Sequence, residues 1–237
     1  MLVAQIQKDE RIIANDHQKY NYILNNKDNL VCPICKKKVI FVDGIFVIKH
    51  FRHKAKNNCS FEPETKEHIE MKNTVCGLLN LNPLKHLEVN VGYAVPDIYL
   101  PKEKIAIEVQ NSNLSYKKFI ERTRRYTREG VHVLWIFHKN LLHEDVSKTL
   151  KKAHEIYFGR IYIYSNWKIY PVHLEPKTTT RTDINGLPYI WFYKRKRGTI
   201  YGEKVRGDIF KTKNNWKENN FLIARFYDKQ FWKGGQK

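Results

Sequence analysis

The chain has 237 residues, of which 42% are hydrophobic and 28% are charged, so it can form one core of ordinary size plus a small additional module. No apolar run approaches the roughly 20 residues that span a bilayer. The N-terminal segment is too short for a signal-peptide core, and charged residues follow it closely. These features exclude a membrane-spanning chain, and we expect a cytoplasmic protein.

The net charge indicates the class of partner. Lys and Arg number 43 against 24 for Asp and Glu, which gives a formal net charge of +19. Such a charge attracts polyanions, of which nucleic acid is the commonest and an anionic membrane surface is the competitor. No long amphipathic helix with a Trp/Leu face supports a membrane partner. The remaining alternative is a basic surface without a specific partner.

Three of the four cysteines lie between residues 32 and 59, in a pattern typical of metal ligands. Cys32-Pro-Ile-Cys35 has the C-x2-C spacing of a zinc knuckle, in which two thiolates bind one ion. Residues 38–49 then form two apolar strands around Asp43-Gly44, a dipeptide that strongly predicts a two-residue hairpin turn. With the turn at that dipeptide, His53 lies opposite Ile34, between the two cysteines.

These residues predict a tetrahedral zinc site of three cysteines and one histidine. Cys59, six residues beyond His53, completes the set with Cys32 and Cys35, and His50 is the alternative fourth ligand. A full ligand set leaves no open position, so the zinc is expected to be structural. It would fold residues 30–62, a segment too small to fold on its own core.

A helix is expected over residues 64–79, because apolar residues recur there at helical spacing. His68 and Lys72 lie one turn apart on a neighbouring face of this helix. Three strands are predicted next, at residues 87–93, 95–100 and 105–110. Glu88 on the first strand is either a further metal ligand or a solvent-facing charge.

The four-residue connection between the last two strands predicts a register in which Asp97 faces Glu108. Two carboxylates opposite each other on a sheet face repel, unless a cation lies between them. Mg²⁺ is held by one or two carboxylates together with waters and phosphate oxygens. Asp97 and Glu108 are therefore candidate ligands for Mg²⁺ or Mn²⁺, and Gln110 projects from the same face. The alternative is a pair of ordinary strand-end charges with water between them.

A second helix is expected from Ser115, which can cap it, to about Glu129, with Gly130 as the stop. Its polar faces carry cations that include Arg122 and Arg125, and a buried strand follows at residues 131–137. A helix that joins two adjacent strands implies a parallel pair. The order of elements predicts an α/β fold with a restriction-endonuclease-like core, a mixed sheet flanked by helices.

Pro96-Asp97 followed by Glu108-Val-Gln110 resembles the PD-(D/E)xK nuclease motif, with Gln in the position of the Lys. More specifically, the chain resembles the competence protein CoiA family over roughly residues 1–175. The features that carry the resemblance are, in order, Cys32-Pro-Ile-Cys35, His50-Phe-Arg-His53, Cys59, Glu67-His68 with Lys72, Asp97, Glu108-Val-Gln110-Asn-Ser112, Ser115, Arg122, Tyr126, Gly130 and Leu134-Trp-Ile136.

The resemblance implies a DNase whose bacterial relatives act on incoming single-stranded DNA during natural transformation. Asp97 and Glu108 would be the metal ligands, and Gln110 would replace the usual catalytic lysine. Glu67 and His68 match the conserved-motif helix and could bind the second side of the metal or the phosphate. A neutral amide can orient the attacking water but supplies no positive charge, so Lys72 is our candidate to supply it.

The C-terminal residues 177–237 hold 15 Lys and Arg against 5 Asp and Glu, together with 12 of the 31 aromatic residues. Basic residues interleaved with aromatic ones suit single-stranded nucleic acid, because bases stack on rings while cations follow the phosphates. The run Lys194, Arg195, Lys196 and Arg197 would be the densest phosphate contact. The alternative is a small β-rich lobe in which the aromatic side chains form the core.

The sequence thus divides into an N-terminal strand with a zinc module at residues 1–62, a nuclease-like domain at 63–176 and a basic aromatic region at 177–237. The expected function is metal-dependent hydrolysis of DNA phosphodiester bonds, with single-stranded DNA favoured, in DNA uptake and recombination or in processing of foreign DNA. The alternative is a non-catalytic single-stranded DNA-binding or recombination factor on a nuclease-derived fold.

Overall fold

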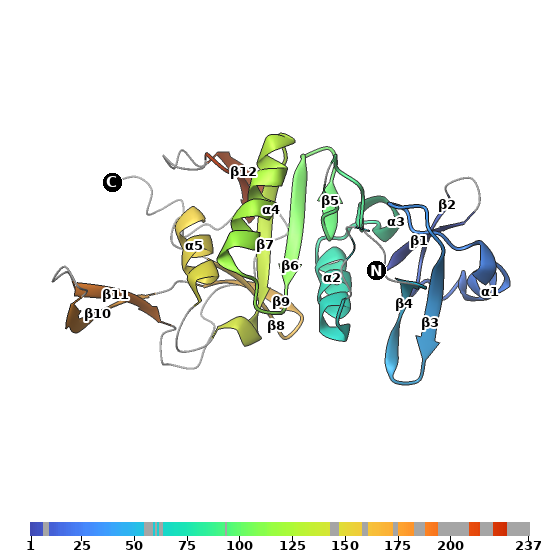
Figure 1. Cartoon of the computed structure of the whole chain (residues 1–237), viewed down its shortest axis with the longest axis horizontal. Helices are drawn as coiled ribbons and strands as arrows, with labels where there is room; N and C mark the ends of the chain where they lie inside the picture. Colours follow the sequence, from blue (N-terminus) through green and yellow to red (C-terminus); the bar gives the residue numbers. More distant parts are fainter. Residues whose placement is uncertain are drawn as a thin grey trace. The chain divides into compact units, whose positions relative to one another are not determined.

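A computed structural model describes residues 1–6, 10–54, 59, 61, 64–92, 94–142, 147–157, 161–172, 175–182, 188–193, 209–213 and 220–226 (Figure 1). The chain divides into two compact units, residues 1–106 and 107–237. The division falls inside one strand, and each unit is described by itself.

The N-terminal part of the first unit packs two antiparallel strand pairs around one apolar core. Its elements are β1 (Val3–Ile6), β2 (Glu10–Ile13), α1 (Tyr20–Asn25), η1 (Lys27–Asn29), β3 (Val39–Gly44) and β4 (Val47–His53). The core contains side chains from each strand pair, including Ile6, Ile12, Val39 and Phe51. The hairpin β3–β4 therefore contributes one face to this core.

The β3–β4 hairpin was predicted, but its register differs from the prediction. Val39 pairs with His53 and Val42 pairs with His50, with a shift before Gly44 and Val47. The turn therefore lies beyond Asp43-Gly44 and consists of Ile45 and Phe46. The position of the turn was not predicted from its apolar residues, because the Asp-Gly dipeptide is the stronger sequence signal for a turn.

The rest of the first unit consists of α2 (Lys66–Leu78), α3 (Pro83–His86) and β5 (Ile98–Leu100). Helix α2 confirms the helix expected over 64–79, and the Thr65 side chain caps it by accepting from the His68 backbone N–H. The strand predicted at 87–93 is wrong. Among the described residues 87–92 only isolated bridges form, because Glu88 and Gly92 have positive φ angles of 49° and 58°.

The second unit has a mixed sheet flanked by helices. It comprises β6 (Ile105–Gln110), which begins in the first unit, and α4 (Tyr116–Arg128), β7 (His132–His138), η2 (Lys139–Leu141), α5 (Lys148–Ile156), β8 (Ile161–Ser165) and β9 (Lys168–Val172). Strand β7 lies beside β6 and pairs in parallel with β8, while β9 is antiparallel to β8. Helix α4 packs on β7 and α5 on β8. The expected mixed α/β architecture is confirmed.

The caps predicted for α4 are also confirmed. The side chain of Ser115 accepts a hydrogen bond from the Lys118 backbone N–H, and Gly130 after the helix has a φ of 68°. The buried residues of α4 are Phe119, Ile120, Thr123 and Tyr126, so its apolar stripe faces the sheet. The cationic residues lie on its remaining faces, as the sequence indicated.

The C-terminal residues contribute four strands, β10 (Glu175–Thr182), β11 (Pro188–Tyr193), β12 (Ile209–Lys213) and β13 (Leu222–Phe226). Strands β10 and β11 form an antiparallel pair, as do β12 and β13. Strand β13 also pairs in parallel with β7, through Ile223 and Val133, and so joins the sheet of the second unit. The basic run Lys194, Arg195, Lys196 and Arg197 lies outside the described residues.

Across the described ranges, no helix is long and apolar enough to cross a membrane.

Candidate metal sites and nuclease-like site

The N-terminal part of the first unit brings four potential metal ligands together. They are Cys32, Cys35, His53 and Cys59, and their ligand atoms all lie within 4.8 Å of one another. The Sγ atoms of Cys32 and Cys59 are 3.8 Å apart, and Cys35 Sγ lies 3.2 Å from His53 Nε2. The expected ligand set is therefore assembled in the folded chain.

The donor types of this cluster and its Cys32–Cys59 distance suit a zinc ion, while the Cys35–His53 distance of 3.2 Å would have to lengthen on binding. Tetrahedral zinc with bonds of about 2.3 Å to sulfur and 2.0–2.1 Å to nitrogen requires S···S distances of about 3.8 Å and S···N distances of about 3.6 Å. A Cys3His cluster with these edges could bind zinc. His50, the alternative ligand, is not in the cluster, and its Nδ1 lies 2.7 Å from the Ile48 carbonyl oxygen.

Although the hairpin register was predicted wrongly, His53 lies in the cluster where the sequence analysis expected it. His53 is the last residue of β4 and pairs with Val39, which follows Cys35 by four residues. The strand pairing therefore still brings His53 close to Cys32 and Cys35. The knuckle itself is closed by a hydrogen bond from the Lys36 N–H to the Cys32 carbonyl oxygen at 3.0 Å. Burial raises the pKa of the Cys32 thiol to about 12 in the absence of metal. Zinc binding would therefore displace a proton from this thiol.

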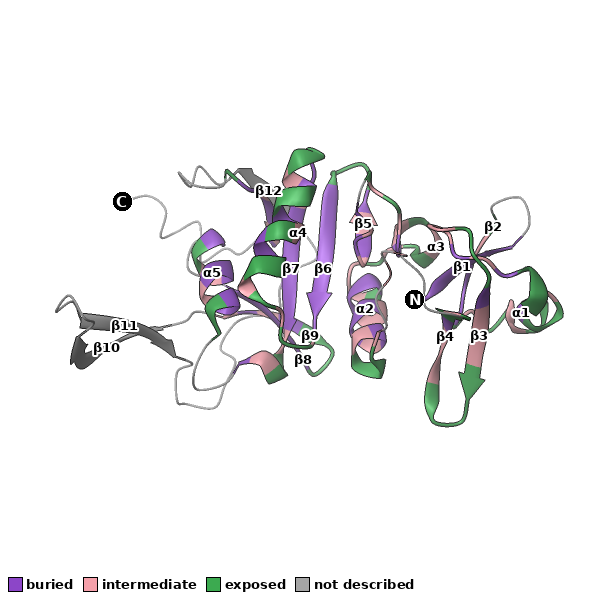
Figure 2. Cartoon of the chain, in the orientation of Figure 1, coloured by how far each residue is buried: buried purple, intermediate pink, exposed green. Residues whose placement is uncertain are grey.

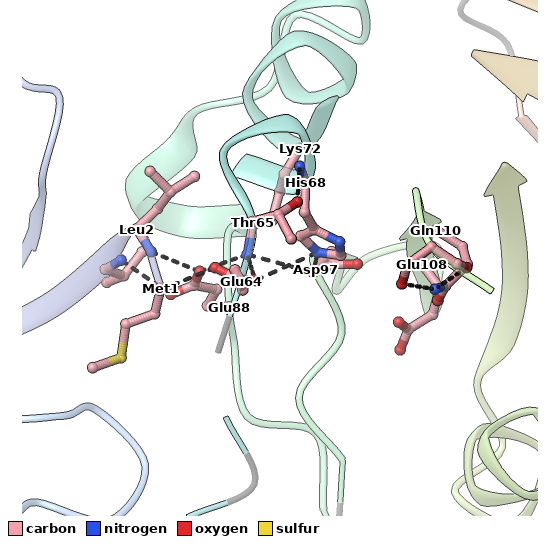
Figure 3. A network of polar contacts seen from close by, with 12 residues as sticks. Met1, Leu2, Glu64, Thr65, His68, Lys72, Glu88, Asp97, Glu108 and Gln110 are labelled. Atoms are coloured by element: carbon pink, nitrogen blue, oxygen red, sulfur yellow. Dashed lines mark hydrogen bonds and ion pairs between the residues drawn. The ribbon is translucent and has the colours of Figure 1, made fainter. Parts of the chain in front are cut away.

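A second group of donors lies between α2 and the start of β5, in the same unit (Figure 3). Glu64, His68 and Asp97 each offer a ligand atom within 4.8 Å of the others. His68 Nε2 is 3.0 Å from Asp97 Oδ1 and 3.4 Å from Glu64 Oε1. Because the side chains of Glu64, His68 and Asp97 are 11%, 17% and 12% exposed, the group is partly accessible to solvent.

The ammonium group of Lys72 lies among these carboxylates. Its Nζ is 2.5 Å from Glu64 Oε1, 2.7 Å from Glu88 Oε1 and 3.4 Å from Asp97 Oδ1, and its side chain is 0% exposed. The three carboxylates hold the Lys72 pKa well above its ordinary value, although burial opposes this shift. Lys72 was expected to supply charge to a reaction, and in the structure its charge compensates the acidic cluster.

Glu88 anchors the N-terminal strand to this cluster. It is 1% exposed and accepts hydrogen bonds from the backbone N–H groups of Leu2, at 2.7 Å, and Val3, at 3.0 Å. The expectation that Glu88 could be a solvent-facing charge is wrong, because the left-handed backbone at Glu88 turns its side chain inward. Together with Lys72, Glu88 ties β1 to α2.

The pKa values of Glu64 and His68 are shifted in opposite directions by their neighbours. Burial raises the pKa of Glu64, but the attraction of Lys72 and of the Met1 amino group outweighs burial and lowers it to about 2. For His68, burial lowers the pKa, but Asp97 and Glu64 raise it more, so the net shift is upward. The unliganded cluster therefore favours the charged form of Glu64 and shifts His68 toward its protonated form.

The second unit positions the other motif residues. Glu108 is 5% exposed on β6, the Tyr126 hydroxyl donates to its Oε1, and Arg122 Nη1 lies 3.6 Å from its Oε2. Gln110 is 7% exposed, and its Nε2 donates to the Ser112 carbonyl oxygen at 2.8 Å. The same Nε2 is 3.2 Å from the Ser112 hydroxyl, so Ser112 holds the amide nitrogen of Gln110.

The remaining predicted site residues are distributed as follows. Glu67 is an exposed residue of the first turn of α2 and is not a member of the donor group. Arg125 forms an ion pair with Glu121 at 2.5 Å, and its side chain is 48% exposed. Asp97 belongs to the first unit and Glu108 to the second.

Two site residues were not identified from the sequence. Glu64 precedes His68 by four residues and Lys72 by eight, a spacing that would place all three on one face of the helix expected over 64–79, and this spacing was the available signal. In the structure Glu64 lies just before the Thr65 cap of α2. Tyr126 was named only among the features that carry the family resemblance, without a role at the site. Its position four residues after Arg122 places both side chains near Glu108, and no sequence spacing indicated that Glu108 would be their shared partner.

The two donor groups and the mixed sheet define a class of protein, an α/β protein with a sulfur-rich cluster and a separate carboxylate-rich site. The family model for the competence protein CoiA nuclease-like domain matches residues 64–181, and that for the competence protein CoiA N-terminal domain matches residues 14–62. The chain therefore belongs to the CoiA-like competence protein family. Searches of curated proteins and of solved structures gave no significant match.

Proposed function

We propose that this protein is a metal-dependent deoxyribonuclease that hydrolyses phosphodiester bonds of DNA, with single-stranded DNA favoured, in DNA uptake and recombination or in processing of foreign DNA. The observation that carries the proposal is the group Glu64, His68 and Asp97, whose donor atoms converge within 4.8 Å inside the segment matched by the nuclease-like family model. The proposed architecture is a restriction-endonuclease-like core.

The donor types fit a divalent cation. Carboxylate oxygens are the ligands of Mg²⁺, while an imidazole in the set favours Mn²⁺ over Mg²⁺. Glu64, His68 and Asp97 would hold the cation, and the PD-(D/E)xK order of the sequence adds Glu108 to the candidate ligands. A divalent cation bound there would polarise the phosphodiester and lower the pKa of a bound water.

The other residues then have defined roles. Gln110, whose amide nitrogen is held by Ser112, would present its carbonyl oxygen to orient the attacking water. Lys72 would keep the carboxylates of Glu64 and Asp97 close together, because like charges that near would otherwise separate. Glu67, Arg122 and Arg125 remain candidates for contact with the DNA backbone.

The cleavage assay that tests this proposal uses labelled single- and double-stranded DNA with Mg²⁺, with Mn²⁺ or without added divalent cation. A chelator is omitted from the last condition because it would also remove zinc from the cysteine cluster. We expect cleavage only with added metal, and a loss on the order of 100-fold or more in Asp97→Ala and Glu108→Ala. Glu70→Gln is the matched control, an α2 carboxylate that is 42% exposed and outside the donor group.

One observation favours the second candidate, a non-catalytic single-stranded DNA-binding or recombination factor. The Lys72 ammonium and the Met1 amino group already offset much of the negative charge of the acidic cluster, which reduces its need for a metal. DNA binding without cleavage under every metal condition, unchanged in Asp97→Ala, would favour this candidate over the nuclease.

A further inference from the structure

The tip of the β3–β4 hairpin exposes three consecutive apolar residues. Ile45 is 95% exposed, Phe46 is 90% exposed and Val47 is 46% exposed, and Figure 2 shows the turn between the two strands as exposed. Single exposed apolar side chains are ordinary, but a run of three at a turn is unfavourable unless it has a function. This tip is therefore a candidate interaction site.

The two faces of the same hairpin differ in character. Val39, Phe41 and Phe51 belong to one face and pack in the core of the first unit. Because side chains alternate along a strand and Ile40 pairs with Arg52, the opposite face carries Lys38, Ile40, Val42, Ile48, His50 and Arg52. We call this face, together with the tip residues 45–47, the ribbon surface.

The cations of the ribbon surface lie at the end remote from the tip. Lys38 and Arg52 are both exposed, and neither pairs with a carboxylate among the residues that the structure describes. Arg52 is six residues from Phe46, a span of about 20 Å along an extended strand. Partly exposed apolar side chains occupy the surface between them.

We propose that the ribbon surface binds single-stranded DNA, with Phe46 stacking on a base and with Lys38 and Arg52 contacting phosphates. The identity of the ligand rests on the function proposed above, and the site itself rests on the exposed tip and the cations of one face. Aromatic rings and cations along one groove or ribbon are the combination that binds single strands without sequence preference. A span of about 20 Å accommodates several nucleotides.

The arrangement fits DNA better than a lipid surface. An apolar tip that enters a bilayer inserts only about 5–10 Å, so its partner cations must lie close to the tip at the level of the headgroups. The cation closest to the tip along the sequence, Lys49, is directed to the core side of the hairpin, 3.9 Å from the centroid of the Tyr20 ring. Lys38 and Arg52 lie farther away, where they can follow a DNA backbone.

The test measures binding of a fluorescent oligothymidylate to the full chain by anisotropy. Added Mg²⁺ and Mn²⁺ are omitted to prevent cleavage, and no chelator is present, so the zinc is retained. Phe46→Ala is expected to weaken binding about 5- to 100-fold, whereas Phe46→Trp keeps a stacking ring and retains affinity. Leu24→Ala, at another exposed apolar residue of the first unit, is the matched control and binds as the wild type.

Salt dependence tests the cations separately. Replacing both Lys38 and Arg52 by Ala should reduce the slope of log affinity against log salt by about 1.4, because each phosphate contact on a single strand contributes about 0.7. Phe46→Ala should leave the slope unchanged. Lys66→Ala, an exposed cation on α2, should leave both affinity and slope unchanged.

Wild-type affinity and slope in the Phe46 and Lys38/Arg52 variants would overturn the inference. So would a loss of binding to phosphatidylserine vesicles, or of self-association, in Phe46→Ala while DNA binding stays intact. The proposed nuclease is judged separately. If the wild type cleaves DNA with metal and Phe46→Ala binds normally, only this inference fails, and if the wild type neither binds nor cleaves DNA, both fail.

Discussion

Replacing Lys72 by Met should destabilise the first unit strongly. The Lys72 side chain is 0% exposed and contacts three carboxylates, among them Glu88, which is 1% exposed, and Glu64, whose side chain is 11% exposed. Met keeps the length of the side chain and removes only the charge. Breaking a buried ion pair by removing one partner costs about 3–5 kcal/mol, because the remaining charge stays buried without compensation.

The magnitude can be checked in two ways. A loss of about 3–5 kcal/mol corresponds to a fall in melting temperature of about 6–20 °C for a chain of this length. All five Trp residues lie after residue 106, so their fluorescence reports the second unit, and circular dichroism is needed to follow α2 as well. Urea unfolding of wild type and Lys72→Met at pH 7, followed by both signals, measures the change.

Acidic pH tests whether uncompensated carboxylate charge is the cause of the destabilisation in Lys72→Met. The Glu64 pKa is lowered to about 2, so the stability that its charge contributes is present above the unfolded value of about 4.5 and is lost as pH falls toward 2. The loss of unfolding free energy in Lys72→Met should therefore become smaller in acid, where the carboxylates that lost the Lys72 ammonium take up protons. Lys66→Met, at a side chain that is 58% exposed and 4.0 Å from Glu70, should change stability by less than about 0.5 kcal/mol. A loss below about 1 kcal/mol in Lys72→Met would refute the reasoning.

Three further predictions concern the remaining polar groups. His53→Ala should reduce bound zinc well below one ion per chain by elemental analysis, whereas His50→Ala should leave it unchanged, and equal zinc in both variants would contradict the ligand assignment. Mn²⁺ affinity measured by calorimetry should increase as pH rises past about 6.5, because the pKa of His68 is raised and the metal must displace a proton from its imidazole. An affinity that does not change with pH would count against His68 as a ligand. Tyr126→Phe should lower the free energy of unfolding in urea by about 1–3 kcal/mol, because it removes the hydroxyl that donates to buried Glu108. Tyr22→Phe, at a residue that is 40% exposed, should change it much less.

The Cys3His cluster was predictable because short-range spacing determines most of it. Cys32 and Cys35 belong to one turn, and any hairpin of suitable length returns His53 toward them. The register was not predictable, since Asp43-Gly44 is the stronger turn signal and the actual turn uses Ile45 and Phe46. Exposed apolar residues at a turn contradict local preference, which is why they point to a function rather than to folding.

The acidic cluster was predicted less completely. Helix α2, the caps of α4 and the strand at 105–110 follow from periodicity and capping residues, which act locally. The inward position of Glu88 could not be predicted in this way. Residues 87–91 alternate as in a strand, whereas a left-handed backbone turns the Glu88 carboxylate toward β1. Such a contact joins residues 86 positions apart, and no local pattern encodes it.

The most direct test of the proposed nuclease is the rate of single-stranded DNA cleavage as a function of Mn²⁺ concentration, for the wild type and for Asp97→Asn. Asn keeps the size of the side chain and removes the charge that a metal requires. The account predicts saturable, Mn²⁺-dependent cleavage in the wild type and a loss on the order of 100-fold or more in Asp97→Asn. Cleavage that persists unchanged in the variant would contradict the assignment of Asp97 to the metal site.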